Sequence, residues 1–190
     1  MRAIGAMGGR RWRVAGGGAV TAAAPGGVSE AWGLEPHEVD RGPCFSKGAI
    51  TAFSGQYKFL SNFSWSTLHF EGQEYPSVEH AFQAAKLRTN PERRKRGFCD
   101  PALSFGEAKR LGRQVALRED WKEIREDVMA RCLASKFSEP ALRQRLLATR
   151  GRELIDGHWG SPDLLWGYHF PSQAGENRLG RLLMELRGGL

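Results

Sequence analysis

The segment that most constrains the fold of this chain is 75–87, with the sequence YPSVEHAFQAAKL. The fixed φ angle of Pro76 suits the first turn of a helix, and Ser77 beside it belongs to a favoured N-cap type. Glu79 then lies in the first turn, where the helix dipole stabilises a carboxylate. These signals predict a helix through most of the segment.

This predicted helix has two distinct faces. At about 100° per residue, Glu79, Gln83 and Lys86 fall on one polar stripe. The apolar side chains lie mainly on another side: Val78, Ala81, Phe82 and Ala85. The polar stripe is either an ordinary solvated surface with a Glu–Lys pair or a reactive site that the rest of the chain completes.

Composition and charge narrow the class of protein. A chain of 190 residues is long enough for one domain with a sizeable core and a tail. Its 41% hydrophobic and 26% charged residues are typical of a soluble globular protein, and no apolar run is long enough to span a bilayer. The net charge of +7 favours anionic partners, either phosphorylated metabolites or nucleic acid.

The cysteine and histidine residues give no metal-ligand pattern. The three cysteines are widely separated and lack C-x-x-C spacing, and the five histidines form no H-x-x-x-H or H-E-x-x-H motif. We therefore expect reduced thiols in an intracellular, cytoplasmic protein, with no metal and no cofactor.

The first 48 residues differ from the rest of the chain. They are rich in Gly and Ala, show no persistent periodicity, and contain no acidic residue before Glu30. We interpret 1–48 as a disordered N-terminal tail, with an organelle-targeting segment as the alternative. The predicted domain covers 49–190.

The remaining patterns predict an α+β fold, a helix-rich single domain with a small antiparallel sheet. Strand-like segments occur at 49–53, 67–70, 73–75 and 153–156. Capping segments and helical periodicity predict further helices at 104–117, from 120, from 138 and at 177–187. The second of these helices is expected to be capped by Asp120.

Two other segments suggest binding. The basic run at 93–96 is either a solvated surface or a phosphate-binding segment. The irregular segment 157–175 is long for a loop in a compact domain and rich in aromatic residues, which is typical of a functional loop.

An ordered series of short motifs covers most of the predicted domain. The motifs are FLSNF at 59–63, YPSVEHAFQAAK at 75–86, GR at 112–113, REDW at 118–121, KF at 136–137, DLLWG at 163–167 and NRLGRLLMELR at 177–187. No single motif is decisive, but their order resembles that of the NADAR, or YbiA-like, family of N-glycosidases.

The resemblance implies hydrolysis of an N-glycosidic bond at C1 of a ribose. In one branch of the family the substrates are phosphoribosylated pyrimidine intermediates of riboflavin synthesis. In another branch, ADP-ribose is removed from guanine in nucleic acid or nucleotides. The family's functional positions correspond here to Glu79, Lys86, Trp121 and Asp163. The chain departs from the family pattern at 160–162 and 168–171, which leaves the choice of substrate open.

Cleavage of a ribosyl C1–N bond needs an acid for the departing nitrogen and negative charge near the sugar. We expect Glu79 and Asp163 to be these two carboxyls, brought together from the helix and the late loop. Asp163 has a simpler alternative role, as a loop residue that caps a turn. The amine of Lys86 either displaces the base through a Schiff base or binds the substrate phosphate.

Further residues are expected to hold the substrate. Trp121 is predicted to stack on the base, with packing in the core as the alternative. Three residues are predicted to line the same pocket: Phe63, Trp166 and Gly167. Three amides are predicted to bond the sugar or base: Asn62, Gln83 and Asn177. Three arginines are predicted to bind phosphate, with surface ion pairs as the alternative: Arg113, Arg118 and Arg178.

Three functions remain open from the sequence. The leading one is an N-glycosidase that acts on a small phosphorylated ribosyl substrate. The second is an ADP-ribosyl-guanine hydrolase, whose partner is ADP-ribosylated nucleic acid or a nucleotide. The third is a module that binds ADP-ribose or nucleic acid without turnover. The oligomeric state stays unknown.

Overall fold

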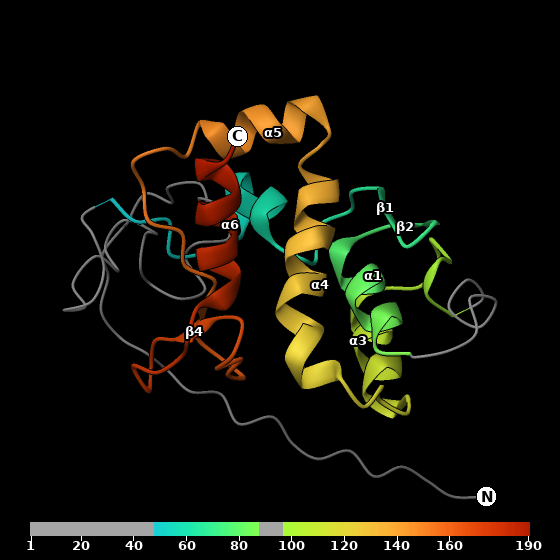
Figure 1. The fold of residues 1–190 in the computed structure, drawn as a ribbon. Coiled ribbons are helices and arrows are strands. Elements are labelled where there is room, and N and C mark those ends of the chain that lie inside the picture. Colours follow the sequence, from blue (N-terminus) through green and yellow to red (C-terminus); the bar gives the residue numbers. More distant parts are fainter. Residues whose placement is uncertain (1–47, 88–96) are drawn as a thin grey trace, which may run out of the picture.

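A computed structural model describes residues 48–87 and 97–190 of the chain (Figure 1). Its helices are α1 Val78–Ala85, α3 Phe105–Gln114, α4 Trp121–Lys136, α5 Pro140–Leu147 and α6 Arg178–Gly188. A 3-10 helix, η2, covers Gly55–Leu60. None of the described helices is long and apolar enough to cross a membrane. The predicted tail, apart from Gly48, and the basic run at 93–96 lie outside the described residues.

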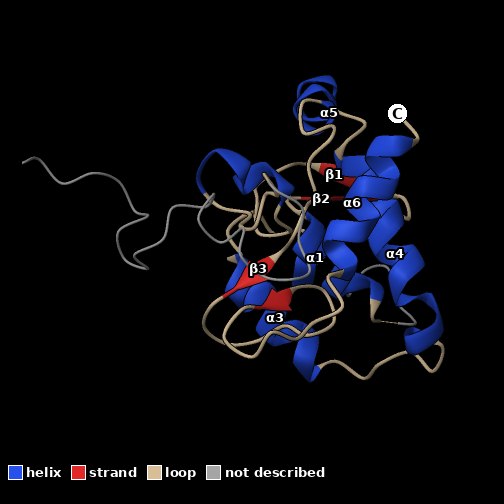
Figure 2. Ribbon diagram, turned by 90° about the vertical axis from the view of Figure 1, so that its left-hand side faces the viewer, coloured by secondary structure: helices blue, strands red, loops and turns tan. Residues whose placement is uncertain are grey.

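The strands are β1 Leu68–Phe70, β2 Gln73–Tyr75, β3 Gly157–His158 and β4 Tyr168–His169. β1 and β2 form an antiparallel hairpin in which Leu68 pairs with Tyr75, whereas β3 and β4 form a short parallel pair. The predicted helix-rich α+β fold with a small antiparallel sheet is confirmed (Figure 2).

The strands predicted at 49–53 and 153–156 are wrong. The two segments meet in a single parallel bridge between Ile50 and Leu154. The contact stays this short because the chain bends at Phe53 and then enters η2. Two backbone hydrogen bonds of 2.8 Å still tie Ile50 to the later segment, so the start of the domain is fixed beside the region that precedes β3.

α1 lies in the interior of the molecule, packed against both α3 and α4. All eight of its residues are buried, so the polar stripe is not an ordinary solvated surface. Ser77 is the N-cap as predicted, and its side chain accepts a hydrogen bond from the backbone N–H of His80. Pro76 precedes the cap and does not lie in the first turn, which corrects the prediction.

α3 approaches α1 closely because Gly112 has no side chain to hold the two helices apart. The predicted capping box at the start of α3 is present. Ser104 accepts from the backbone N–H of Glu107, and the Glu107 carboxylate accepts from the N–H of Ser104. The helix is thereby fixed at its N-terminus and delivers its inner face to α1.

α4 packs against α1 on one side and α6 on the other (Figure 1). Its buried side chains include Val128, Met129, Cys132 and Leu133. The side-chain cap expected from Asp120 is absent, because that carboxylate pairs with Arg118 instead. α4 thus lies between α6 and the helix that carries the polar stripe.

Candidate active site

A cavity of about 1070 Å³ opens between α1, α3, the segment 49–63 and the loop that ends at Trp166. Seven of the predicted site residues line it: Asn62, Phe63, Glu79, Gln83, Lys86, Asp163 and Trp166. Two carboxyls and an amine from distant parts of the chain therefore face one cavity. The catalytic roles assigned to them stay predictions.

Glu79 projects from the first turn of α1 and is 5% exposed. Its Oε1 accepts a 2.8 Å hydrogen bond from Nε2 of Gln83, one turn further along the helix. Burial raises the pKa of Glu79 and outweighs this hydrogen bond, which lowers it. The charges of Lys109 and Lys86 also lower the pKa, and that of Asp163 raises it. Glu79 thus holds a proton closer to neutral pH than an exposed glutamate does, as a general acid requires.

Lys86 follows the last turn of α1 and is half-buried. Its Nζ donates to the backbone carbonyl of Gly112 over 3.3 Å and lies about 6 Å from the ring centres of Phe82 and Trp121. Burial lowers the pKa of Lys86, and the Glu79 carboxylate partly opposes this. A lysine with a lowered pKa has a larger neutral fraction, which makes its amine a better nucleophile.

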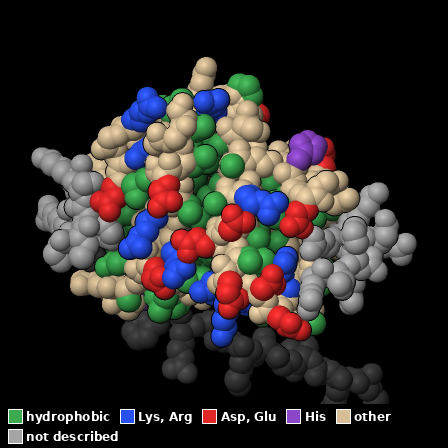
Figure 3. Space-filling view, in the orientation of Figure 1, with side chains coloured by type: hydrophobic (Ala, Val, Ile, Leu, Met, Phe, Trp, Pro, Cys, Tyr) green, Lys and Arg blue, Asp and Glu red, His purple; other side chains and the backbone are tan. Residues whose placement is uncertain are grey.

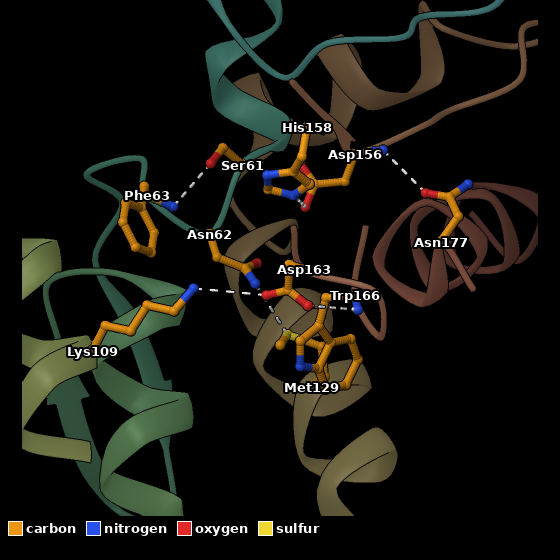
Figure 4. A network of polar contacts seen from close by, with 10 residues as sticks. All are labelled: Ser61, Asn62, Phe63, Lys109, Met129, Asp156, His158, Asp163, Trp166 and Asn177. Atoms are coloured by element: carbon orange, nitrogen blue, oxygen red, sulfur yellow. Dashed lines mark hydrogen bonds and ion pairs between the residues drawn. The ribbon is translucent and has the colours of Figure 1, made fainter. Parts of the chain in front are cut away.

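Asp163 caps a turn and also lines the cavity. Its Oδ1 accepts a 3.0 Å hydrogen bond from the backbone N–H of Trp166, which caps the turn of the late loop. Its Oδ2 lies 3.7 Å from Nζ of Lys109 and completes an ion pair at the cavity (Figure 4). The turn therefore fixes the carboxylate while leaving it beside the cavity and a cation.

Lys109 is a cavity residue that the sequence reasoning missed. It lies on α3, three residues before Gly112, so it shares the helix face that is turned toward α1. This spacing from the GR motif was the available signal. Its Nζ lies 5.7 Å from the centre of the Phe63 ring, and its charge acts on both Glu79 and Lys86.

Two buried carbonyl oxygens in the cavity wall have no hydrogen-bond partner among the described residues. They are Oδ1 of Asn62 and Oε1 of Gln83. The nitrogen ends of the two amides are used, since Asn62 lies 3.6 Å from Sδ of Met129 and Gln83 donates to Glu79. An unpaired buried acceptor costs about 1–3 kcal/mol, so a ligand with hydroxyl or N–H donors gains by pairing with these oxygens.

The aromatic residues divide between the cavity wall and the core. Phe63 and Trp166 line the cavity, and Trp166 also packs edge-on against Phe82 at 5.3 Å. Trp121 is 7% exposed, packs 5.0 Å from Phe82 and is not among the cavity residues. The structure thus places Trp121 in the core, where Phe82 occupies the adjoining wall, and gives its predicted stacking on the base no support.

The three predicted phosphate-binding arginines also lie outside the cavity lining. Arg118 forms two hydrogen bonds of 2.6 and 2.9 Å with Asp120, and Arg113 is exposed on α3. Arg178 bonds Glu176 and Glu126 and so ties the start of α6 to α4. Ion pairing of this kind was the alternative given for these arginines, and it describes Arg118 and Arg178 in this structure.

Asn177 and Gly167 support the loop without lining the cavity. Asn177 adopts the left-handed backbone conformation, with φ of 50°, which asparagine tolerates well. Its amide donates to the carbonyl of Leu154 and accepts from the N–H of Asp156, which leaves little of it for a substrate. A Cβ at Gly167 would stand 2.4 Å from the His158 ring, so glycine is required for this packing.

Comparison with known proteins identifies the fold. The NADAR domain family model matches residues 48–190. The chain belongs to the NADAR family. It is 37% identical over 143 residues to N-glycosidase YbiA of Escherichia coli, covering 70% of this chain and 82% of that protein. The NMR structure of the same E. coli protein matches with a TM-score of 0.63 at 35% identity, covering 74% of this chain and 82% of that one.

A further relative is a chloroplastic riboflavin biosynthesis protein, PYRR, of Arabidopsis thaliana. The two are 33% identical over 120 residues, which is 62% of this chain and 18% of the plant protein. The match to YbiA shows the enzyme class. Like that relative, the chain is an N-glycosidase, a hydrolase that acts on N-glycosyl bonds.

An acid–histidine pair, Asp156 and His158, also lines the NADAR cavity and was not predicted. Nε2 of His158 lies 3.3 Å from Oδ2 of Asp156. The next residue, Trp159, lines the cavity and stacks on Phe170 at 4.6 Å. The signal in the sequence was the irregular loop itself. Within 48–87 and 97–190, no group of three or more His, Cys, Asp or Glu is placed to hold a metal ion.

Proposed function

We propose that this NADAR enzyme hydrolyses the ribose C1–N bond of phosphoribosylated pyrimidine intermediates of riboflavin biosynthesis and releases ribose 5-phosphate. The observation that carries the proposal is the single cavity in which Glu79, Lys86 and Asp163 meet. The similarity to a plant riboflavin biosynthesis protein favours this pathway over others. The partner is then a small phosphorylated ribosyl compound.

In the simpler mechanism the two carboxyls act directly. Glu79, whose pKa is raised by burial, gives its proton to the departing nitrogen as the C1–N bond breaks. The Asp163 carboxylate, fixed by its turn, stabilises the positive charge that develops on the ribose. Water then adds to C1, and its proton returns to the Glu79 carboxylate. Each turnover consumes one water and restores both groups.

The amine of Lys86 supports a second route. When the ribose is attached to an exocyclic amine, its ring opens to give an imine at C1, and Lys86 in its neutral form attacks this carbon. The bond from C1 to the base nitrogen breaks as Glu79 supplies a proton. Water then hydrolyses the protonated lysine imine, which releases the sugar and returns the proton to Glu79. Reduction with borohydride during turnover traps this imine on Lys86. A direct attack by water leaves no adduct.

The removal of ADP-ribose from guanine is the alternative function. One observation favours it: the cavity continues along 49–58 and takes in Lys58 and Arg152, beyond the carboxyls and amine. Its volume lies at the upper end of the range for small-molecule sites. A second observation counts against nucleic acid as the substrate. On the face shown in Figure 3, acidic and basic side chains are mixed, whereas a nucleic-acid-binding surface is usually basic.

A direct comparison of substrates tests the proposal. The enzyme is incubated with a ribosylaminopyrimidine phosphate, with ADP-ribosylated guanosine and with a guanine oligonucleotide carrying ADP-ribose. The proposal predicts release of ribose 5-phosphate from the first, with a kcat/KM at least about tenfold above the others. Cleavage confined to the ADP-ribosylated compounds would replace it with the alternative function.

A further inference from the structure

A pair of groups that the proposed mechanism does not use lies at the short strand β3. His158 is the last residue of β3, and Asp156 is the residue immediately before the strand. Nε2 of His158 lies 3.3 Å from Oδ2 of Asp156, and Figure 4 shows this contact beside the Asp163 network. Both residues line the cavity and both are half-buried.

The orientation of this pair is fixed from two sides. The N–H of Asp156 donates to Oδ1 of Asn177 over 3.0 Å, and Nδ2 of Asn177 donates to the carbonyl of Leu154. On the other edge, the imidazole packs so closely on Gly167 that a Cβ there would stand 2.4 Å from Cδ2 of His158. The ring is therefore held by a carboxylate at Nε2 and by backbone at its carbon edge.

This arrangement leaves Nδ1 as the ring nitrogen of His158 that is not engaged by Asp156. Nδ1 makes no hydrogen bond within the described part of the chain. The hydrogen bond to Asp156 raises the pKa of His158 against the opposing effect of burial. Of the other charged groups that act on the ring, Asp163 raises the pKa and Lys109 on α3 lowers it. The raised pKa extends the doubly protonated form of the ring toward higher pH than in an ordinary histidine, and in that form Nδ1 is a donor.

Other cations of the cavity are already engaged. Lys86 donates to the carbonyl of Gly112, and Lys109 pairs with Asp163. Arg152 donates to a backbone carbonyl at the start of the domain and to a tyrosine hydroxyl. Lys58 lines the cavity but is exposed, so its side chain has to be ordered before it can hold a ligand.

We propose that His158, oriented by Asp156, binds the phosphate group of the substrate through Nδ1–H. A charge-assisted hydrogen bond from an imidazolium ion to a phosphate oxygen is shorter and stronger than a neutral one. Asp156 acts as a positioning residue, because it holds the ring and does not itself contact the phosphate. The inference rests on the proposed function in one respect, that the substrate carries a ribose phosphate.

Binding of the product sugar tests this without turnover. Calorimetry at pH 7 compares ribose 5-phosphate with ribose for the wild-type chain and for His158→Gln and Asp156→Asn. We expect His158→Gln to weaken ribose 5-phosphate binding about 10- to 100-fold and to leave ribose binding unchanged. Asp156→Asn is expected to give a smaller loss of the same kind. The matched control is His169→Gln, because His169 pairs with His158 in β4 but does not line the cavity.

The dependence on pH gives a second readout that a merely structural role would not change. Between pH 7 and 9 the phosphate keeps its dianionic charge, while the imidazole loses its proton. Wild-type affinity for ribose 5-phosphate should therefore fall over this range, and His158→Gln should show no such fall. A thermal unfolding midpoint for each variant separates loss of binding from loss of fold.

Three results would overturn the inference: equal losses for ribose and ribose 5-phosphate in His158→Gln, unchanged binding of both, or a wild-type chain that does not prefer the phosphorylated sugar. Failure of the proposed function looks different. In that case the ribosylaminopyrimidine phosphate is not cleaved, while the His158-dependent preference for ribose 5-phosphate persists.

Discussion

Gly112 of α3 lies directly against the Gln83 side chain of α1. A Cβ at Gly112 would stand 1.8 Å from Oε1 of Gln83 and 2.9 Å from its Cβ, closer than any real pair of atoms allows. Gln83 in turn donates to the Glu79 carboxylate. One glycine on α3 therefore limits the position of Gln83, the hydrogen-bond partner of the proposed acid Glu79.

Gly112→Ala is expected to displace Gln83 and, through it, Glu79. The overlap involves the Cβ of Gln83 as well as its flexible end, so the helices must shift, at a cost of about 1–3 kcal/mol in the free energy of unfolding. We expect kcat to fall about 10- to 100-fold from the misplaced acid. Denaturant unfolding and steady-state kinetics measure the two effects.

Gly106→Ala in the same helix is the matched control. No atom lies within 4 Å of the position of its added Cβ, so activity should stay unchanged and stability should rise by about 0.5–1 kcal/mol. Equal behaviour of the two alanine variants would show that the contact with Gln83 does not position the acid.

Trp121 and Trp166 should respond differently to truncation. Trp166→Ala removes a cavity wall, and we expect a rise in KM of about 5- to 100-fold. Trp121→Phe removes buried volume behind Phe82, and we expect a loss of about 1–3 kcal/mol in stability with little change in KM. A large rise in KM for Trp121→Phe, with unchanged stability, would instead show that Trp121 stacks on the base.

The division between these tryptophans shows where sequence reasoning stops. Helical spacing placed Glu79, Gln83 and Lys86 on one stripe, and the motif order placed Asp163 in the same site, because both signals are local or follow chain order. Which side of Phe82 Trp121 occupies depends on how α1 and α4 cross, and no local pattern encodes that.

The charged residues show the same limit. Arg118 and Arg178 have the side chain that suits phosphate, but in the folded chain both form ion pairs with acidic residues. Lys109 and His158 gave weak local signals, and only the packing of α3 and β3 brings them to the cavity. Residue type predicts what a side chain can bind, whereas tertiary structure decides whether it is available.

Lys109→Met should shift the pH dependence of activity upward. The positive charge of Lys109 lowers the pKa of Glu79 and that of Lys86. Without it, both pKa values rise, so both limbs of the pH–rate profile move to higher pH. Arg110→Met, on the same helix and outside the cavity, is the control and should keep the wild-type profile. A profile that moves in neither limb would mean that Lys109 does not act on the catalytic groups.

Lys136 gives the fold a pH-dependent stability. Its side chain is fully buried, and its Nζ donates to the carbonyl of Ser61 over 2.9 Å. Burial lowers the pKa of Lys136 to about 7, compared with about 10.4 in an unfolded chain. Between these values the unfolded chain binds a proton that the folded chain does not, so stability rises with pH.

This contribution reaches about 2–3 kcal/mol between pH 7 and 9 and should vanish in Lys136→Met. Lys122→Met, an exposed position on α4, should keep the wild-type slope. The measurement is the free energy of unfolding in denaturant at several pH values. The same slope in Lys136→Met as in the wild-type chain would place the titrating group elsewhere.

The central claim is that the Glu79 carboxyl is the acid that releases the base from the ribose. The most direct measurement is the kcat of Glu79→Gln for release of ribose 5-phosphate from a ribosylaminopyrimidine phosphate. The control is Glu123→Gln, which changes an exposed glutamate on α4. We predict a fall in kcat of about 10²- to 10⁴-fold for Glu79→Gln, with an unchanged unfolding midpoint, and no change for Glu123→Gln. Cleavage by Glu79→Gln at the wild-type rate would contradict the claim.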